Sequence, residues 1–437
     1  MANKLRVIFN YLKYRHVHRF KSRAAIEAYQ EKGIKRLMKH LDKHSLYYHG
    51  LISQSTTQAK MSYRDRLRLL PIMDKVTMMA NFDRLVCVPL TKEEGFQLAI
   101  DSEKTRDFKG KMNGLTVGLS SGTSAHRGLF IASQKEADIW TGSILARMLP
   151  KMSRHHEIAF FLRANSNLYE NVKTKRIGFT YYDIYEAMDK HIEGLNHAQA
   201  DILIAPPSVL MVLGEAIAEG RLKLRPDKVI SVAEVLEDRD RDYFCQQFNV
   251  AQIHQVYQCT EGFLAYTCDY GTLHINEDIV LIEEEAIDEE RFIPIITDFT
   301  RRSQPIVRYR LNDVLVHKKE ACPCGCSFTA LEKIEGREDD VFIFSRNKGS
   351  DLKIFPDIIR RCILYVPGIK NYEVIQINPN KIQINLDYSE GDKSLIQEKL
   401  RDEFAIVVQT FDLEGIEIEF GDYKHTTERK MKRVRRI

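Results

Sequence analysis

The stretch GLSSGTSAHRGLF, from Gly118 to Phe130, combines small hydroxyl side chains and glycines with the cation Arg127. Exposed backbone N–H groups and small hydroxyls can surround phosphate oxygens closely, and a nearby cation offsets their charge. The stretch therefore predicts a loop that binds a phosphate chain. Serine and glycine alone would equally favour an ordinary surface turn, so the rest of the chain has to decide between the two.

Three further polar clusters carry the carboxylates and cations that nucleotide chemistry needs. They are YQCTEG at residues 257–262, YRLND at 309–313 with GREDD at 336–340, and TTERKMKRVRR at 426–436. Carboxylates of such clusters can bind a divalent cation, and their arginines and lysines can pair with phosphate oxygens. Each cluster also has a purely structural interpretation, as a core tyrosine, a turn aspartate, a solvated loop or a basic tail.

Two other common nucleotide-binding motifs are absent from the sequence. It contains no Gly-Lys-Ser/Thr of a Walker loop and no Gly-x-Gly-x-x-Gly after a predicted strand. These absences leave the four clusters as the strongest functional signal.

In this order and at these separations, the four clusters resemble the motifs of the adenylate-forming superfamily of acyl and aryl ligases. The resemblance is to its phenylacetate–CoA ligase and coenzyme-F synthetase-related branch, and it covers about residues 118–433. It implies a large α/β adenylation domain of several sheets with a β-rich subdomain, followed by a small mobile α+β domain. It also implies ATP and Mg²⁺ as cofactors.

The resemblance assigns the first cluster to the phosphate loop that holds the β- and γ-phosphates of ATP. Arg127 takes the place of the usual lysine, and Ala125 stands where the family has glycine. Alanine does not readily adopt a positive φ, so the freedom of the backbone there is reduced. The loop residues implied to contact phosphate are Ser120, Ser121, Gly122, Thr123 and Ser124.

The second cluster resembles the aromatic–Gly–x–Thr–Glu motif of the family. Tyr257 would stack on adenine, Thr260 would bind the α-phosphate, and Glu261 would bind Mg²⁺. Gln258 stands where glycine is usual.

The later clusters resemble the ribose-binding and hinge motifs. Asp313 would accept both ribose hydroxyls, Arg337 would reach the ribose or phosphate, and Asp339 would be the hinge. Lys430 resembles the catalytic lysine of the small domain, with Lys432 as its rival. Arg429 precedes Lys430 where the family usually has glycine.

A separate group of cysteines suggests a structural metal site. Cys322, Cys324 and Cys326 lie within five residues, and Cys268 and His274 lie upstream. Two such segments joined by a sheet predict tetrahedral Zn²⁺ held by Cys268, Cys322 and Cys324, with His274 or Cys326 as the fourth ligand. Reduced, half-buried thiols are the alternative, because Cys-x-Cys-x-Cys is not the usual spacing.

The coarse pattern of the chain is α/β. A helix is predicted from about Ala24 to Lys60, and a strand at LTVGL leads through the loop into a helix at residues 133–150. Alternating strands and helices follow, with strands at residues 157–163 and 227–234, a helix at 238–248, a single strand over residues 252–268 and a β-rich stretch from Gly271 to Val316. Residues 372–388 alternate as in a β-hairpin. We expect a large domain at residues 1–336 and a β-α-β module at 337–437.

Composition excludes several other classes of protein. The 437 residues carry a net charge of +4, which gives no case for a nucleic-acid binder. There is no apolar run of membrane-spanning length and no secretory signal, so we expect a cytoplasmic protein.

The predicted function is ATP-dependent activation of an aryl or acyl carboxylic acid as acyl-AMP, with possible transfer to CoA or a carrier-protein thiol. The acid would lie among small and apolar residues, with Glu234 binding an amine or hydroxyl or capping a loop. Two alternatives stay open: an adenylyltransferase that places AMP on a hydroxyl, and a non-catalytic ATP-binding protein. The residues expected to line the acid pocket are Pro206, Pro207, Ser208, Val232 and Ala233.

Overall fold

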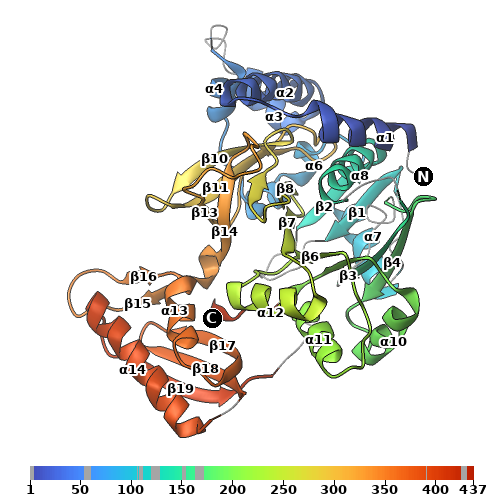
Figure 1. The fold of residues 1–437 in the computed structure, drawn as a ribbon. Helices are drawn as coiled ribbons and strands as arrows, with labels where there is room; N and C mark the ends of the chain where they lie inside the picture. Colours follow the sequence, from blue (N-terminus) through green and yellow to red (C-terminus); the bar gives the residue numbers. More distant parts are fainter. Residues whose placement is uncertain are drawn as a thin grey trace. The chain divides into compact units, whose positions relative to one another are not determined.

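The computed structural model describes residues 4–53, 61–105, 107, 112–119, 128–149, 154–162, 172–389, 391–424 and 431–437. The chain divides into two compact units (Figure 1). The first comprises Met1–Leu311 and His317–Lys333, and the second comprises Asn312–Val316 and Ile334–Ile437. The division after Lys333 lies three residues before the boundary expected from the sequence, and the short segment 312–316 groups with the second unit. The predicted α/β class, with a smaller C-terminal α+β unit, is confirmed.

Twelve of the described strands form one mixed sheet. Its order is β10-β11-β13-β14-β9-β8-β7-β6-β5-β3-β4, with β12 paired to β11. The segment from β4 to β7 is parallel, because the chain crosses between strands through helices. The parallel strands are β3 (His156–Leu162), β4 (Ile177–Asp183), β5 (Ile202–Ala205), β6 (Lys228–Val232) and β7 (Ile253–Cys259).

Apolar faces of the crossover helices cover this parallel segment. Leu203, Leu213, Val229 and Phe244 are fully buried members of one core that these helices share with the strands. The near-continuous apolar runs of the strands reflect burial on both faces. The helices are α10 (Met188–Ala198), α11 (Pro207–Ala218) and α12 (Asp238–Phe248).

The remainder of the sheet is largely antiparallel. The single strand expected over residues 252–268 is a hairpin, because the Thr260–Glu261 turn reverses the chain after β7. The residues on both sides of this polar turn follow a strand pattern. For that reason the sequence alone was also compatible with one continuous strand. The strands are β8 (Gly262–Thr267), β9 (Leu273–Ile275), β10 (Val280–Ala286), β11 (Arg291–Asp298), β12 (Ile306–Arg310), β13 (Asp313–His317) and β14 (Ala330–Arg337).

A separate two-stranded hairpin carries the segment that precedes the serine-rich stretch. Strand β1 (Leu115–Leu119) pairs antiparallel with β2 (Leu129–Ser133), and α8 (Gln134–Met148) follows at once. Ser133 and Glu136 form a capping box at the start of α8. The sequence predicts strand, loop and helix here, and the structure adds β2 between the loop and the helix.

The N-terminal segment is helical and packs on α8 and on the antiparallel strands. The predicted helix from Ala24 onward is interrupted at Ser45, which separates α2 (Arg23–His44) from α3 (Leu46–Ser53). Helix α1 (Lys4–Leu12) lies on α8 and continues into a π-helical turn at Lys13–Val17. The others are α4 (Tyr63–Arg68), α5 (Lys75–Ala80), α6 (Phe82–Leu85) and α7 (Lys92–Thr105).

The second unit contains a four-stranded sheet in the order β19-β18-β17-β20. The alternating residues of β17 and β18 bury one face against α13 and α14, as the sequence predicts for a β-α-β module. The elements are β15 (Phe342–Phe344), β16 (Leu352–Ile354), α13 (Pro356–Leu364), β17 (Ile369–Asn378), β18 (Lys381–Tyr388), α14 (Lys393–Phe411), β19 (Glu417–Asp422) and β20 (Val434–Arg436).

Within the described parts of the chain, no helix combines the length and the apolar character needed to cross a bilayer.

The close contact of α1 with α8 depends on Gly142. A Cβ atom at Gly142 would lie 2.5 Å from Cβ of Asn10 and 2.9 Å from the backbone oxygen of Val7. Gly142→Ala should therefore lower the free energy of unfolding by about 1–3 kcal/mol, as overpacking typically does. Urea unfolding measures the change.

Gly50→Ala is the matched control, because a Cβ there meets nothing within 4 Å and the residue lies inside α3. This variant should gain about 0.5–1 kcal/mol, since alanine favours helix over glycine. Equal effects of the two substitutions would contradict the packing described here.

Candidate active site

The carboxyl ends of three neighbouring parallel strands bring the predicted acid pocket and the second motif to one edge of the sheet. Strand β6 pairs with β5 on one side and with β7 on the other, all parallel. The segments that follow these strands therefore emerge side by side: residues 206–208 after β5, 233–234 after β6 and 260–261 after β7. In open α/β sheets this edge is where ligands bind.

The turn after β6 is strained. Ala233 has a φ of 67°, a left-handed conformation that is unusual for a residue with a Cβ. The turn aims Glu234 at α11, where its carboxylate accepts a hydrogen bond of 3.0 Å from the backbone N–H of Ser208. Glu234 therefore caps the start of α11, one of the two roles that the sequence left open.

Thr260 and Glu261 border a shallow depression in the first unit. The Thr260 hydroxyl donates to the Glu261 carboxylate at 2.8 Å, and Tyr309 also hydrogen-bonds Glu261. Burial first, and then the charge of Glu261, raises the pKa of Tyr309, so the phenol keeps its proton. Lys75 is among the residues that line the same depression.

Lys75 reaches this site because residue 73 pairs with β12. The N–H of Met73 donates to the Arg308 carbonyl, and the N–H of Arg310 donates to the Met73 carbonyl, each at 2.8 Å. The carboxylate of Asp74 then accepts a hydrogen bond from the N–H of Thr77 and starts α5. The sequence pattern indicates a loop and helix here but gives no sign that the loop joins the site.

Arg301 connects the Thr260–Glu261 turn with the strand that follows the serine-rich stretch. Its guanidinium donates to the Thr260 carbonyl at 2.8 Å and to the Ile131 carbonyl at 2.9 Å. It also donates to the Gln304 side chain at 3.2 Å, and the residue is only 7% exposed. Arg301 thus ties the Thr260–Glu261 turn to β2, about 130 residues earlier in the sequence.

Two buried carboxyl groups flank Arg301. Glu136 accepts hydrogen bonds from the N–H groups of Arg302 and Ser303 at 2.6 and 2.8 Å. Burial opposes ionisation of Glu136, but the charge of Arg301 and the hydrogen bonds from Ser133 and Ser303 hold its pKa below the usual value. Glu136 is therefore an anion that balances the buried guanidinium.

Asp298 is the second of these carboxyl groups and behaves differently. Burial raises its pKa to about 6, even though Thr300 and Arg301 hydrogen-bond to it. A Cβ added to Gly262 would lie 3.4 Å from the Asp298 carboxyl, so this group sits directly behind the Thr260–Glu261 turn.

Gln258, which replaces the family's glycine, has a clear structural role. The indole N–H of Trp140 in α8 donates to the Gln258 side-chain oxygen at 3.1 Å. Tyr257 beside it is 7% exposed. The hydrogen bond between Gln258 and Trp140 therefore joins β7 to α8.

The ribose and hinge motifs lie together in the second unit. Arg337 approaches Asp313 with 3.5 Å between Nε and the carboxylate, and the Asn312 amide donates to Asp339 at 2.9 Å. The Glu338 N–H donates to the Asn312 carbonyl at 2.6 Å. YRLND and GREDD, predicted from separate stretches, thus form one cluster.

The predicted phosphate-loop residues and the candidate lysine lie outside the described residues. These are Ser120, Ser121, Gly122, Thr123, Ser124, Arg127 and Lys430.

The rival lysine, Lys432, is described and forms an ion pair. Its ammonium lies 2.7 Å from the carboxylate of the buried Asp340, just before β20. Lys432 is thus an anchor for the C-terminal strand.

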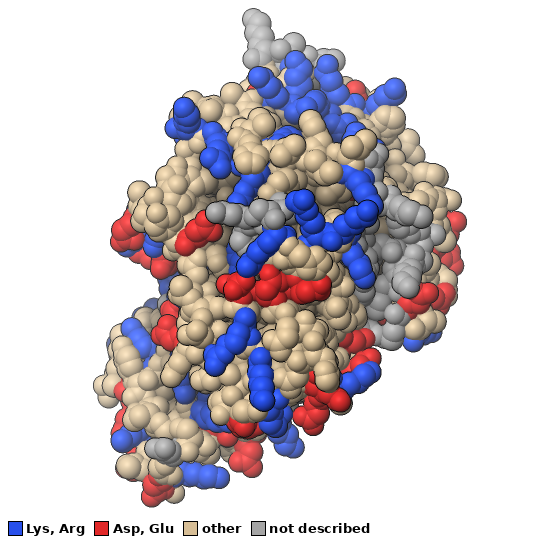
Figure 2. Space-filling model, turned by 45° about the vertical axis from the view of Figure 1, so that its right-hand side comes forward, with Lys and Arg blue, Asp and Glu red and all other residues tan. Residues whose placement is uncertain are grey.

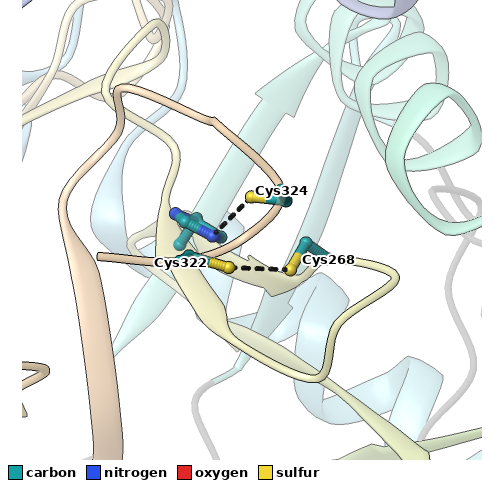
Figure 3. A group of neighbouring side chains, drawn as sticks. Cys268, Cys322 and Cys324 are labelled. Atoms are coloured by element: carbon teal, nitrogen blue, oxygen red, sulfur yellow. Dashed lines mark hydrogen bonds between the residues drawn. The ribbon is translucent and has the colours of Figure 1, made fainter. Parts of the chain in front are cut away.

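The predicted metal ligands converge at one point of the first unit, apart from the Thr260–Glu261 turn (Figure 3). One ligand atom from each of Cys268, His274, Cys322 and Cys324 lies within 4.8 Å of the others. The sulfurs of Cys268 and Cys322 are 3.7 Å apart, too far for a disulfide, and Cys324 lies 3.3 Å from His274 Nε2. Cys326 is not part of this set and hydrogen-bonds Tyr266 instead.

The tautomer of His274 is set by its other nitrogen. Nδ1 lies 3.2 Å from the Phe328 carbonyl, which can only accept, so Nδ1 carries the proton and Nε2 presents a lone pair toward the sulfurs. Fixing the ring through its second nitrogen is typical of metal-binding histidines.

Asp298 predicts a specific pH dependence of stability. Its pKa of about 6 lies above the ordinary value of 3.8, so the folded state binds this proton more tightly than the unfolded state. The resulting stabilisation is complete below about pH 4 and is lost as the pH rises through 6. The free energy of unfolding of the native protein minus that of Asp298→Asn should therefore fall by up to about 3 kcal/mol between pH 4 and 8. Denaturant unfolding across this range measures the difference, and a flat profile would show that Asp298 ionises normally.

No family model and no curated protein matches the sequence, but solved structures share its fold. A 2-hydroxyisobutyryl-CoA ligase in the postadenylation state with R3-HIB-AMP gives a TM-score of 0.68 at 15% identity, covering 93% of this chain and 88% of the ligase. The same ligase in an open conformation with 2-HIB-AMP and CoA gives 0.59 at 16% identity, covering 93% and 90%. Fatty acyl-adenylate ligases from E. coli and L. pneumophila give 0.52 at 10% identity, covering 72% and 67%. This protein therefore has the fold of the adenylate-forming ligases.

Proposed function

We propose that this protein is an ATP-dependent adenylate-forming ligase that activates a carboxylic acid and passes the acyl group to a thiol such as CoA. The fold supports this, because the ligases that share it bind acyl-adenylates and CoA. The observation that carries the proposal is the Arg301 bridge. It joins the Thr260 carbonyl to the Ile131 carbonyl of β2, the strand that leads on from the serine-rich stretch, and this supports a triphosphate site that uses both motifs.

The reaction would begin with attack of the acid's carboxylate oxygen on the α-phosphorus of ATP. A new P–O bond forms to the acid, the bond to the β-phosphate bridging oxygen breaks, and pyrophosphate leaves. Negative charge accumulates on the α-phosphoryl oxygens and on the pyrophosphate. Catalysis therefore requires hydrogen-bond donors and cations fixed in advance around those oxygens.

Residues of the first unit would supply much of this environment. The Thr260 hydroxyl would donate to the α-phosphate, and the N–H groups and hydroxyls of residues 120–124, with Arg127, would hold the β- and γ-phosphates. Lys75 at the rim of the same depression would add a cation. Tyr257 would stack on the adenine.

Glu261 suits a magnesium ligand by its chemistry. Its carboxylate receives hydrogen bonds from Thr260 and Tyr309, which orient it at the depression. Mg²⁺ bound with ATP would neutralise part of the phosphate charge.

The later motifs would contribute the ribose contacts and the last cation. Asp313 would accept both ribose hydroxyls, and Arg337 beside it would keep the carboxylate ionised and oriented. Asp339 would serve as the hinge residue. Lys430 is the better candidate for the catalytic lysine, because Lys432 is committed to the buried Asp340.

The acid would bind at the ends of β5 and β6, where the lining is small and apolar. Pro206 and Pro207 open α11 there, Val232 ends β6 and Ala233 follows it. The Glu234 carboxylate at the same edge accepts a hydrogen bond from the N–H of Ser208. The small and apolar lining favours an aryl or acyl chain as the substrate class.

The central test is Mg²⁺-dependent ATP–pyrophosphate exchange in a screen of aryl and acyl acids. Lys430→Ala should slow exchange by about 10²–10³-fold, since it removes one preorganised donor to the developing charge. Lys432→Ala is the matched control, two residues away and of equal charge. It should leave exchange within a few fold while lowering stability, because Asp340 loses its partner.

Other outcomes of that test would overturn the assignment. Undiminished exchange by Lys430→Ala together with a large loss in Lys432→Ala would move the catalytic role to Lys432. ATP binding without exchange for any acid would indicate a non-catalytic protein, and a stable AMP adduct on a hydroxyl would indicate an adenylyltransferase.

We also propose that Cys268, His274, Cys322 and Cys324 hold a structural Zn²⁺. At a Zn–S distance of about 2.3 Å, the edge of a tetrahedron between two sulfurs is about 3.8 Å. The 3.7 Å separation of the Cys268 and Cys322 sulfurs fits this edge, and the presented Nε2 of His274 completes a Cys₃His set. The metal would join the β8–β9 turn to the segment before β14.

The zinc proposal predicts one equivalent of Zn²⁺ in the purified protein by elemental analysis and native mass spectrometry. Cys324→Ser should lose most of the metal and lower the thermal midpoint. Cys326→Ser, two residues further on and outside the ligand set, should keep its zinc. Equal zinc content in both variants, or none in the native protein, would disprove the assignment.

A further inference from the structure

Helix α1 presents an apolar stripe to the solvent. Leu5, Ile8, Phe9 and Leu12 are 80%, 53%, 66% and 48% exposed. Their spacing of three and four residues places them on one side of the helix. Such a stripe normally faces a core, so its exposure over more than two turns calls for a partner.

The opposite face of α1 is fixed, so the stripe cannot turn inward. Val7 and Asn10 are buried against α8, and Gly142 allows the two backbones to approach closely. Arg6 forms an ion pair of 3.1 Å with the buried Asp138 of α8. The orientation of α1 is therefore set by packing.

The charge of this segment indicates what the stripe meets. Residues 1–26 contain no Asp or Glu, and the first acidic residue is Glu27. In the view of Figure 2, basic side chains far outnumber acidic ones across the upper part, where the N-terminal helices lie. The seven cations of the segment are Lys4, Arg6, Lys13, Arg15, Arg19, Lys21 and Arg23.

Some of these cations are paired with buried carboxylates and others are exposed. Arg6 and Arg23 bind Asp138 and Glu277, whereas Lys4, Arg19 and Lys21 are exposed. Lys4 begins α1 and Lys13 directly follows it, so cations lie at both ends of the stripe. An apolar stripe bordered by cations matches the chemistry of an anionic lipid surface.

We propose that α1 docks this protein on an anionic membrane surface. The stripe of Leu5, Ile8, Phe9 and Leu12 enters the boundary between headgroups and acyl chains, and the flanking lysines and arginines meet lipid phosphates. The helix has nine residues and lies parallel to the surface, because a span needs about twenty. A second copy of the chain is a poorer partner, since stripe-to-stripe contact would place two basic segments against each other.

Vesicle co-sedimentation of the full chain tests this. The protein should bind vesicles of equal parts phosphatidylcholine and phosphatidylglycerol, bind phosphatidylcholine alone at least tenfold more weakly, and dissociate as salt is raised. Ile8→Ser with Phe9→Ser should weaken binding to the anionic vesicles more than tenfold. Leu395→Ser with Ile406→Ser is the matched control on α14, at 48% and 56% exposure, and should bind as the native protein does.

Circular dichroism and ATP–pyrophosphate exchange in the absence of vesicles confirm that each variant is folded. Absence of binding by the native protein, or equal loss in both double variants, would overturn the proposal. Light scattering tests the remaining alternative, a contact between two copies of the chain. If the native chain is a dimer and the Ile8/Phe9 variant a monomer, the stripe is a contact between copies and the membrane proposal is wrong.

Discussion

The candidate nucleotide site depends on one buried cation. A guanidinium removed from water is costly unless acceptors and an opposite charge surround it. Arg301 finds carbonyl acceptors on the Thr260–Glu261 turn and on β2, and its charge is balanced by ionised Glu136 at the start of α8. The turn, the hairpin and the helix are held together because each satisfies part of this one group. Removing Glu136 would leave the buried positive charge of Arg301 without its compensating negative charge.

The spacing of apolar residues predicted helices and strands well wherever a segment follows one period, either helical or extended. The alternation of β17 and β18, the helix at Asp238–Phe248 and the apolar runs of β3 and β6 all lie where the sequence indicates. The ribose and hinge motifs also lie together in the second unit. Each of these depends on residues close in sequence or on strands that must be neighbours in a parallel sheet.

The sequence could not show contacts that depend on the tertiary fold. Arg301 and Glu136 lie 165 residues apart, in segments that look like a charged loop and an ordinary capping box. Nothing in the spacing of CPCGC chooses between His274 and Cys326, because the choice is made by β9 and by the Phe328 carbonyl. Gln258 seems a defect in the motif until Trp140 is seen to donate to it. A signal was available for Glu136 alone, since Ser133 three residues before it marks a helix start.

Helix α8 links the loop that carries Arg301 to the strands beside the cysteine–histidine cluster. Its fifteen residues span about 22 Å. Glu136 in its first turn binds the loop of Arg301, and Arg147 in its last turn binds the buried Asp278 at 2.6 Å.

Asp278 lies three residues beyond the end of β9, which carries His274, and the Arg147 guanidinium lies 4.6 Å from the ring of Tyr266, two residues before Cys268. A metal in the cluster would therefore fix the strands on which the far end of α8 rests. Because none of its ligands lines the depression at Glu261, its contribution belongs to the stability of the first unit, and any effect on catalysis would have to pass along α8.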